Sequence, residues 1–135
     1  MSTITTLQTK PATKIYILQY NCARSTNVMQ SCLNSAINTA DIVLFQEPWI
    51  DRDNITTVSY PAFTSLIPVT SNDCRPRVAA FISKTKVQLV CTPRPDITMD
   101  PDIQALSISA LGLKDILLLN IYNEKDLQPD LDQNL

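Results

Sequence analysis

Short apolar runs separated by polar, proline-containing segments make up most of this chain, and they predict strands rather than helices. Residues 42–46, IVLFQ, form such a run, which is followed by Glu47 and stopped by Pro48. A short run rich in Ile, Val and Phe and bounded by breakers is typical of a buried strand. Residues 14–21, KIYILQYN, predict a second buried strand, of the kind found in parallel sheets.

The segment between these two strands has the spacing of an amphipathic helix. Its apolar residues recur on one helical face, with Asn27 and Gln30 as the start signal. The predicted face consists of Val28, Met29, Cys32, Leu33, Ala36, Ile37 and Ala40. A strand, a crossover helix and a strand form a βαβ unit, whose two strands are parallel.

The apolar runs that follow predict a largely antiparallel meander. Residues 61–69 are interrupted by a proline and predict an edge strand, and 77–83 with 86–91 predict a hairpin, although its turn residues are poor. Residues 104–110 alternate as a half-buried strand does, and 114–122 form the longest apolar run. The expected fold is therefore α/β (α+β), with one sheet and a helix on one of its faces. Residues 1–13 are expected to be a flexible lead-in and residues 124–135 an acidic tail.

Composition places the chain among ordinary folded proteins. It has 135 residues, of which 44% are hydrophobic and 18% charged, as expected for one folded domain rather than a disordered chain. No run approaches the ~20 apolar residues that span a bilayer, and the N-terminus lacks the apolar centre of a secretory signal. We therefore expect an intracellular protein that is not secreted and has no membrane partner. The four cysteines form no C-x-x-C pair, so reduced packing residues are expected.

The absence of histidine narrows the chemistry. With no histidine in the sequence, Ser-His-Asp and Cys-His catalysis, imidazole acid/base chemistry and the commonest zinc ligand are excluded for this chain. The single glycine also excludes a glycine-rich phosphate loop. Any catalysis here would depend on carboxylates, amides, Tyr, Lys or a hard metal ion.

Charge is distributed unevenly along the chain, although the net charge is only −2. Residues 75–95 carry five basic and no acidic side chains, whereas residues 96–135 carry two basic and eight acidic ones. The basic segment is the candidate surface for a polyanion such as nucleic acid. Its alternating charges also fit a solvated sheet face, and the pattern alone leaves both interpretations open.

Polar side chains follow three of the predicted strands at their carboxyl ends. Asn21 ends the first strand, Glu47 follows the second, and Tyr122 with Asn123 closes the last. The parallel βαβ geometry puts Asn21 and Glu47 on one rim, where open α/β sheets bind ligands. Amide and carboxylate oxygens suit Mg²⁺, which could polarise a phosphodiester. The alternatives are that Glu47 is a solvated strand end and Tyr122 the polar cap of a core strand.

Four segments carry a resemblance to a known family: ILQYNCARS, LFQEPW, RPRVAAFIS and NIYN. In order and strand context they resemble the endonuclease/exonuclease/phosphatase superfamily, and within it the endonuclease domain of non-LTR retrotransposon polyproteins. The resemblance implies that Asn21 and Glu47 hold Mg²⁺ or Mn²⁺ and act in catalysis together with Tyr122. It further implies that Arg75, Arg77 and Asn123 bind substrate, that the substrate is DNA, and that a functional protein would be nuclear.

Departures from the family pattern limit what the resemblance implies. The family domain is about twice as long, and its Asp-Phe-Asn and Ser-Asp-His motifs do not occur here. Residues 14–123 would then be a truncated domain, half of a four-layer deoxyribonuclease-like sandwich, from a relic or partial gene model and with negligible activity alone. An apolar sheet face would be left uncovered and would invite self-association or a partner.

The alternative function is a non-catalytic module that binds a partner or nucleic acid through the uncovered sheet face or through segment 75–95. A phosphatase acting on inositol phosphates is a less favoured interpretation within the same family. LFQEPW and RPRVAAFIS favour the retrotransposon group.

Overall fold

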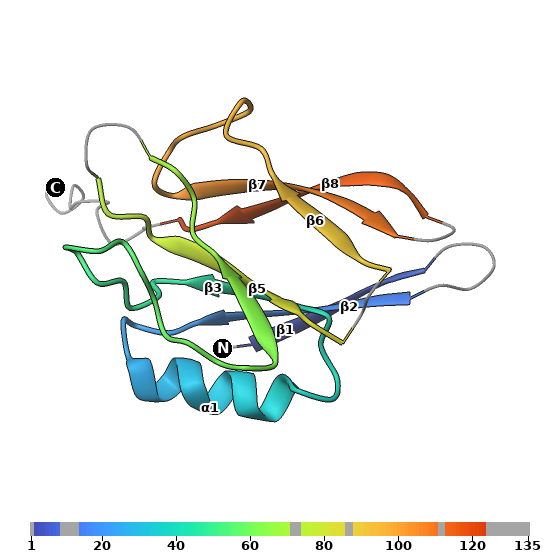
Figure 1. Cartoon of the computed structure of the whole chain (residues 1–135), viewed down its shortest axis with the longest axis horizontal. Coiled ribbons are helices and arrows are strands. Elements are labelled where there is room, and N and C mark those ends of the chain that lie inside the picture. The colour runs from blue at the N-terminus through green and yellow to red at the C-terminus, as the bar shows by residue number, and fades with distance from the viewer. Residues whose placement is uncertain (1, 9–13, 71–73, 86–87, 111–112, 124–135) are drawn as a thin grey trace, which may run out of the picture.

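A computed structural model describes the chain except for residues 1, 9–13, 71–73, 86–87, 111–112 and 124–135. The described residues form one helix and eight strands in a mixed α+β arrangement (Figure 1). In chain order these are β1 (Ser2–Gln8), β2 (Lys14–Asn21), α1 (Thr26–Ala36), β3 (Ile42–Gln46), β4 (Phe63–Leu66), β5 (Val78–Ser83), β6 (Val90–Pro93), β7 (Ile103–Ala110) and β8 (Leu113–Ile121).

The strands form two sheets, and the expected single sheet is wrong. One sheet has five strands in the order β1-β2-β3-β5-β4, and the other has three antiparallel strands in the order β6-β7-β8. Figure 1 shows α1 on one side of the larger sheet and the smaller sheet on its other side. The molecule therefore has three layers, with the larger sheet in the middle.

The predicted βαβ unit is confirmed. β2 and β3 are parallel, with Ile17 opposite Ile42, and α1 connects them. The helix begins earlier than the Asn27 signal suggested, because Ser25 is the N-cap and its hydroxyl accepts a hydrogen bond of 3.1 Å from the Val28 amide. A serine at this position satisfies one of the amide groups that the first helical turn leaves without a partner.

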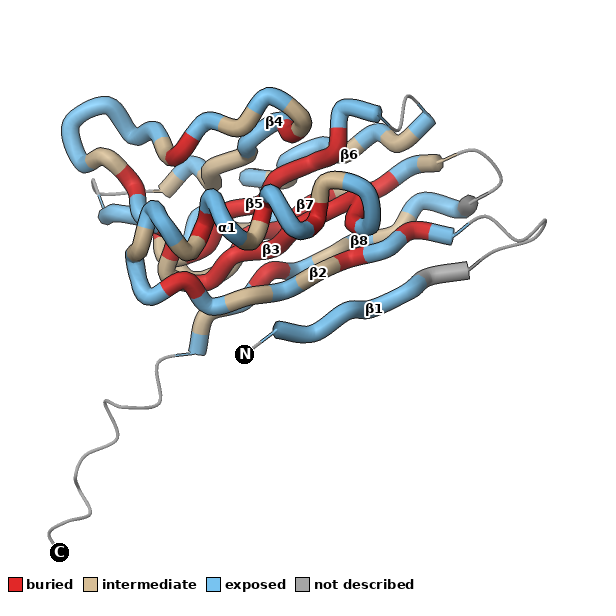
Figure 2. The backbone as a smooth tube through the Cα atoms, turned by 90° about the horizontal axis from the view of Figure 1, so that it is seen from below, coloured by how far each residue is buried: buried red, intermediate tan, exposed pale blue. Residues whose placement is uncertain are grey.

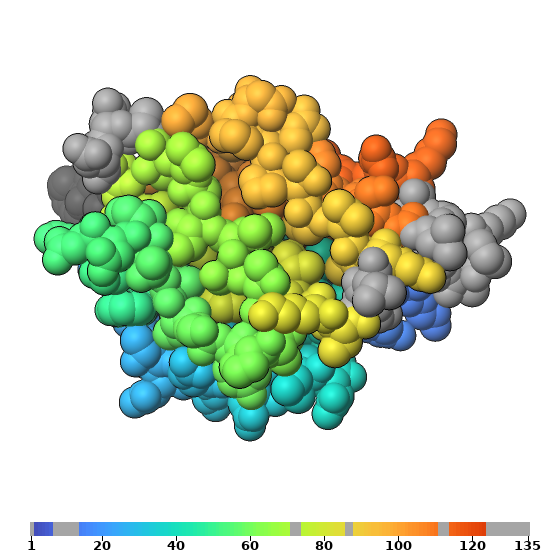
Figure 3. Space-filling view, in the orientation of Figure 1, coloured from blue at the N-terminus to red at the C-terminus, as the bar shows by residue number. Residues whose placement is uncertain are grey.

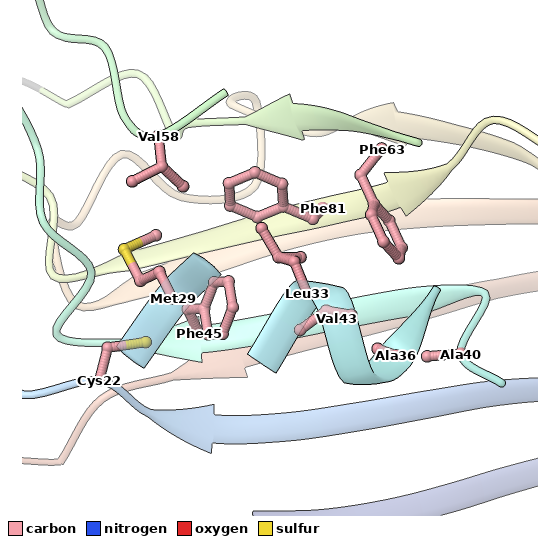
Figure 4. Packing of buried hydrophobic residues seen from close by; sticks show 10 residues of the cluster. All are labelled: Cys22, Met29, Leu33, Ala36, Ala40, Val43, Phe45, Val58, Phe63 and Phe81. Atoms are coloured by element: carbon pink, nitrogen blue, oxygen red, sulfur yellow. The ribbon is translucent and has the colours of Figure 1, made fainter. Parts of the chain in front are cut away.

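Large apolar side chains pack together beneath α1. Met29 and Leu33 point from the helix toward Phe45 and Phe81 of the sheet (Figure 4). The two phenylalanine rings meet edge to face, with 5.4 Å between their centroids, which is a favourable arrangement for aromatic pairs. Figure 2 shows buried residues along the central strands β3 and β5, whereas β1 is exposed at the edge of the sheet.

A second core fills the space between the two sheets. Ile42 and Leu44 of β3 lie in one cluster with Leu106 and Ile108 of β7. The apolar face of the larger sheet is therefore covered by the chain's own second sheet, and the prediction that it is uncovered is wrong. Exposed apolar residues lie instead on the outer side of β8, where Leu117, Leu119 and Ile121 are each roughly half exposed.

The predicted hairpin of residues 77–83 with 86–91 does not form. β5 pairs with β3 and β4, whereas β6 pairs with β7 in the other sheet. The reason is physical: Lys84 and Thr85 are poor turn residues, and the apolar faces of the two strands are better buried in different layers. The predicted edge strand at 61–69 is confirmed as β4, and the strands predicted at 104–110 and 114–122 are confirmed as β7 and β8.

The N-terminal segment also differs from expectation. Residues 2–8 are not a flexible lead-in but form β1, which pairs antiparallel with β2, with Ile4 opposite Leu18. Alternating β-branched threonine and isoleucine side chains favour an extended edge strand even in a polar segment. The acidic segment 124–135 lies outside the described residues. Within the described part of the chain, the one helix has 11 residues and is too short to cross a membrane.

Candidate functional site

Three buried amides between the sheets hold the strands that carry the candidate site. Asn120 Oδ1, on β8, accepts a hydrogen bond of 2.6 Å from the side-chain Nε2 of Gln46. Asn120 Nδ2 donates to the Ala79 carbonyl at 3.1 Å and to Gln104 Oε1 at 3.2 Å. Gln104 Nε2 donates in turn to the Leu66 carbonyl at 2.9 Å. Buried polar groups need such partners, so the network allows few alternative offsets between the sheets. Gln46 precedes Glu47, and Asn120 lies two residues before Tyr122.

Glu47 and Tyr122 meet at the rim that the sequence predicts. Figure 1 shows the carboxyl ends of β2, β3 and β8 at the same end of the molecule. The Tyr122 hydroxyl donates a hydrogen bond of 2.5 Å to Glu47 Oε2, and both residues are half-buried. Glu47 is therefore not simply a solvated strand end, and Tyr122 is more than a polar cap.

Arg77 and Asp102 fix the position of the Tyr122 ring. The Arg77 guanidinium lies over that ring, 5.1 Å from its centroid, and forms a two-point ion pair with Asp102 at 2.7 and 3.0 Å. The Tyr122 amide donates to the Asp102 carbonyl at 2.8 Å. An arginine held by a carboxylate and stacked on an aromatic ring is a rigid support, so the Tyr122 hydroxyl has a defined place beside Glu47.

The backbone at this rim is strained. Glu47 has a φ of 52°, and Ala23 and Arg24, which follow β2, have φ values of 47° and 61°. The two loops hold each other, because the Arg24 amide donates to the Glu47 carbonyl at 2.8 Å. Left-handed backbone at residues other than glycine is costly and clusters at functional sites.

Asn21 supports the loop beside Glu47. Its Oδ1 accepts a hydrogen bond of 3.0 Å from the Ala23 amide, which shapes the turn after β2. The structure thus puts Asn21 on the predicted rim, and no hydrogen bond joins its side chain to Glu47 within the described residues.

A pocket of about 330 Å³ opens beside Glu47 and is surrounded by guanidinium groups. Arg24, Arg75 and Arg77 line it together with Glu47, and the remaining lining residues are Pro48, Cys74, Pro76 and Pro101. Arg24 and Arg75 are exposed and form no ion pair within the described part of the chain. Arginine forks bind phosphate oxygens with good geometry, so the arrangement suits an anion with several oxygen atoms.

Glu47 is the side chain at this rim that could hold a metal ion. No group of three or more Cys, Asp or Glu side chains that could hold a metal occurs among the residues described. Mg²⁺ needs only one or two carboxylates, because water and phosphate oxygens fill its other positions. Glu47 Oε1 accepts no hydrogen bond from a described residue, so this oxygen could serve as one such carboxylate ligand.

The described basic residues of segment 75–95 do not form one surface. Arg75 and Arg77 lie at the rim, but β5 then runs to the other end of the sheet, where Lys84 follows it. Arg94 instead pairs with Asp96 at 2.8 Å. Of the six predicted site residues, Glu47, Arg75 and Arg77 line the pocket, whereas Asn21, Tyr122 and the exposed Asn123 do not.

Two residues of the site were missed from the sequence. Arg24 lies in the ILQYNCARS segment three residues after Asn21, and the parallel rim geometry was a usable signal for it. Asp102 had no such signal, because its pairing with Arg77 joins segments 25 residues apart in the sequence.

All four cysteines are free, and Cys22, Cys32 and Cys91 are buried or partly buried. Cys74 is exposed and lines the pocket, so the expectation that it is a packing residue is wrong. Burial, with smaller contributions from the charges of Cys32 and Glu47, raises the pKa of the Cys22 thiol far above its usual range. Burial also raises the pKa of Cys32 and raises that of Cys91 to about 11. These three thiols stay protonated at neutral pH and act as packing groups.

Three of the four segments singled out in the sequence line this pocket, with Arg24, with Glu47, and with Arg75 and Arg77. The fourth supplies Tyr122, which donates a hydrogen bond to Glu47. No protein-family model matches the chain, and no curated protein matches it.

Proposed function

We propose that the rim around Glu47 binds the phosphate backbone of nucleic acid, and that the chain is related by descent to the Mg²⁺-dependent endonuclease domain of non-LTR retrotransposons. The observation that carries this proposal is one pocket that joins a carboxylate oriented by Tyr122 with three arginines. The helix and two facing sheets would correspond to three layers of the four-layer deoxyribonuclease-like sandwich.

Charge explains why a phosphodiester suits the pocket. Arg24 and Arg75 offer guanidinium groups that no described carboxylate neutralises, so a phosphate would supply the missing negative charge. Glu47 alone repels phosphate, and Mg²⁺ bound there would remove this repulsion and polarise the phosphate. The arginines would orient the phosphate, and Tyr122 would hold one carboxylate oxygen in place through its hydroxyl.

We do not expect this chain to cleave DNA by itself. The sequence has no histidine and neither of the two family motifs that supply the general base and orient attack. A positioned general base contributes a factor of about 10² to 10⁴ in rate. The Tyr122 hydroxyl is committed to Glu47 as a donor, so it does not replace that base. We therefore expect binding without hydrolysis.

A salt titration of DNA binding tests the phosphate pocket. Fluorescence anisotropy with a labelled oligonucleotide between about 50 and 200 mM salt should show affinity that falls steeply as salt displaces the arginine contacts. Arg24→Gln and Arg75→Gln should each weaken binding and lower the salt slope by about one. Arg94→Gln is the matched control, because it removes an arginine that Asp96 already neutralises. Equal weakening by all three variants would show that the pocket has no special role.

Glu47→Gln separates the metal from the arginines. Without divalent metal this variant should bind DNA more tightly than the wild type, because a negative charge leaves the pocket. Added Mg²⁺ should strengthen binding by the wild type but not by the variant. Incubation of supercoiled plasmid with Mg²⁺ should leave it intact with either protein. Cleavage by the wild type that Glu47→Gln abolishes would overturn the expectation of an inactive chain.

A further inference from the structure

A second hollow adjoins the Glu47 pocket and shares an arginine with it. This hollow has a volume of about 310 Å³ and is lined by Arg52, Asp53, Ile55 and Arg75. Because Arg75 lines both spaces, the two are neighbours on one rim. Figure 3 shows the segment that carries this loop, in green, at the left end of the molecule.

Asp51 holds the loop that forms the hollow. Its carboxylate accepts hydrogen bonds from the Asn54 side chain at 2.8 Å and from the Asp53 amide at 3.2 Å. Its backbone closes the loop through bonds of 2.7 Å to the Thr56 carbonyl and 2.9 Å from the Ile55 amide. These bonds within the loop define its shape, which lowers the entropy lost on binding.

Ile55 occupies an unusual backbone conformation in this loop. Its φ is 51°, in the left-handed region that glycine or asparagine adopts readily and that a β-branched residue rarely enters. Its side chain is 50% exposed, so burial in the core does not account for the conformation. The loop presents an apolar side chain to solvent beside two arginines that form no ion pair with a described residue.

We propose that this hollow is a nucleoside subsite, which takes the base next to the phosphate held in the Glu47 pocket. An apolar surface beside guanidinium groups suits the face of a base, because bases stack on arginine planes and pack on apolar side chains. Because Arg75 lines both spaces, it would contact both the phosphate and the nucleoside. Bases in a duplex are stacked on one another, so the subsite selects single-stranded or unpaired nucleic acid. The subsite rests on the proposed function, because it needs a phosphate in the first pocket.

Two probes of equal charge test the subsite. A labelled pentathymidylate and an abasic strand of the same length carry the same phosphates and differ only in their bases. The wild type should bind the pentathymidylate about fivefold more tightly, near the lower end of base-stacking effects on proteins. Ile55→Gly should abolish this preference and leave binding of the abasic strand unchanged. Glycine adopts the required φ without strain, so this variant should fold.

Two further variants separate the subsite from the phosphate pocket. Arg24→Gln should weaken binding of both probes equally and keep their ratio, because Arg24 lines only the first pocket. Ile97→Gly is the matched control, since it removes another exposed isoleucine, and should keep the wild-type preference. A wild type without a preference for bases, or a preference that survives in Ile55→Gly, overturns the subsite and leaves phosphate binding standing. Failure to bind either strand overturns both proposals.

Discussion

Large apolar side chains dominate the packing beneath α1, whereas the space between the two sheets also buries three amides that are hydrogen-bonded to one another. Beneath α1 the large buried residues are Phe45, Phe81, Met29 and Leu33. Between the sheets, isoleucines and leucines lie beside Gln46, Gln104 and Asn120, which are 6%, 3% and 1% exposed.

The two cores have different roles. The apolar core stabilises the fold, and the amide network fixes how the two sheets are offset. Apolar packing is strong but has little directionality, so the core beneath α1 stabilises the fold without dictating how the two sheets are offset. Hydrogen bonds between buried amides tolerate few arrangements, and a wrong offset would leave donors and acceptors without partners. The amides lie next to the site in the chain, so the offset they impose brings Tyr122 to Glu47.

The largest expected effect comes from the apolar core. Phe81→Ala removes a fully buried ring that packs edge to face on Phe45, and should lower the free energy of unfolding by about 3–5 kcal/mol. Urea denaturation would measure this change. Ile4→Ala, at a position 66% exposed, is the control and should change the stability by about 0.5 kcal/mol or less. Under conditions where the Phe81→Ala variant stays folded, its DNA affinity should equal that of the wild type.

A change in the amide network should instead affect DNA binding as well as stability. Asn120→Leu leaves Gln46 Nε2 and the Ala79 carbonyl without their partner, which should cost about 1–3 kcal/mol of stability. The same variant should weaken DNA binding, because β8 then no longer fixes Tyr122 beside Glu47. Urea denaturation and anisotropy on the same sample would separate the two effects. Wild-type affinity in a destabilised Asn120→Leu variant would show that the network does not position the site.

Much of the larger sheet could be predicted because its determinants are local. The helical spacing of Met29 and Leu33 and the apolar run of β3 give the βαβ unit, and parallel crossover geometry brings Asn21 and Glu47 to one rim. These features depend on residues that are close in sequence. The positions of these two site residues could be predicted from such local features.

The rest depends on pairing between distant segments. The partners of β5 and β6 are decided by which apolar faces can be buried together, and no local signal records that choice. Gln46 and Asn120 were visible as amides inside apolar strands, but nothing in the sequence indicated that they bond to each other across 74 positions. The second sheet and the support of Tyr122 by Arg77 and Asp102 were missed for this reason.

The smallest expected effect concerns Cys91, which packs against the core between the sheets. Burial raises the pKa of its thiol from 9.0 to about 11, so the unfolded chain loses this proton at lower pH than the folded chain does. Stability should therefore fall as pH rises from 9 to 11, because the unfolded state binds fewer protons in that interval. Cys91→Ala should make this part of the curve less steep, measured as the urea midpoint at several pH values, and the raised pKa values of Cys22 and Cys32 account for the slope that remains. Thr92→Ala, at the exposed neighbouring position, should keep the wild-type slope. A slope in Cys91→Ala as steep as that of the wild type would mean that this thiol ionises no later in the folded chain than in the unfolded one.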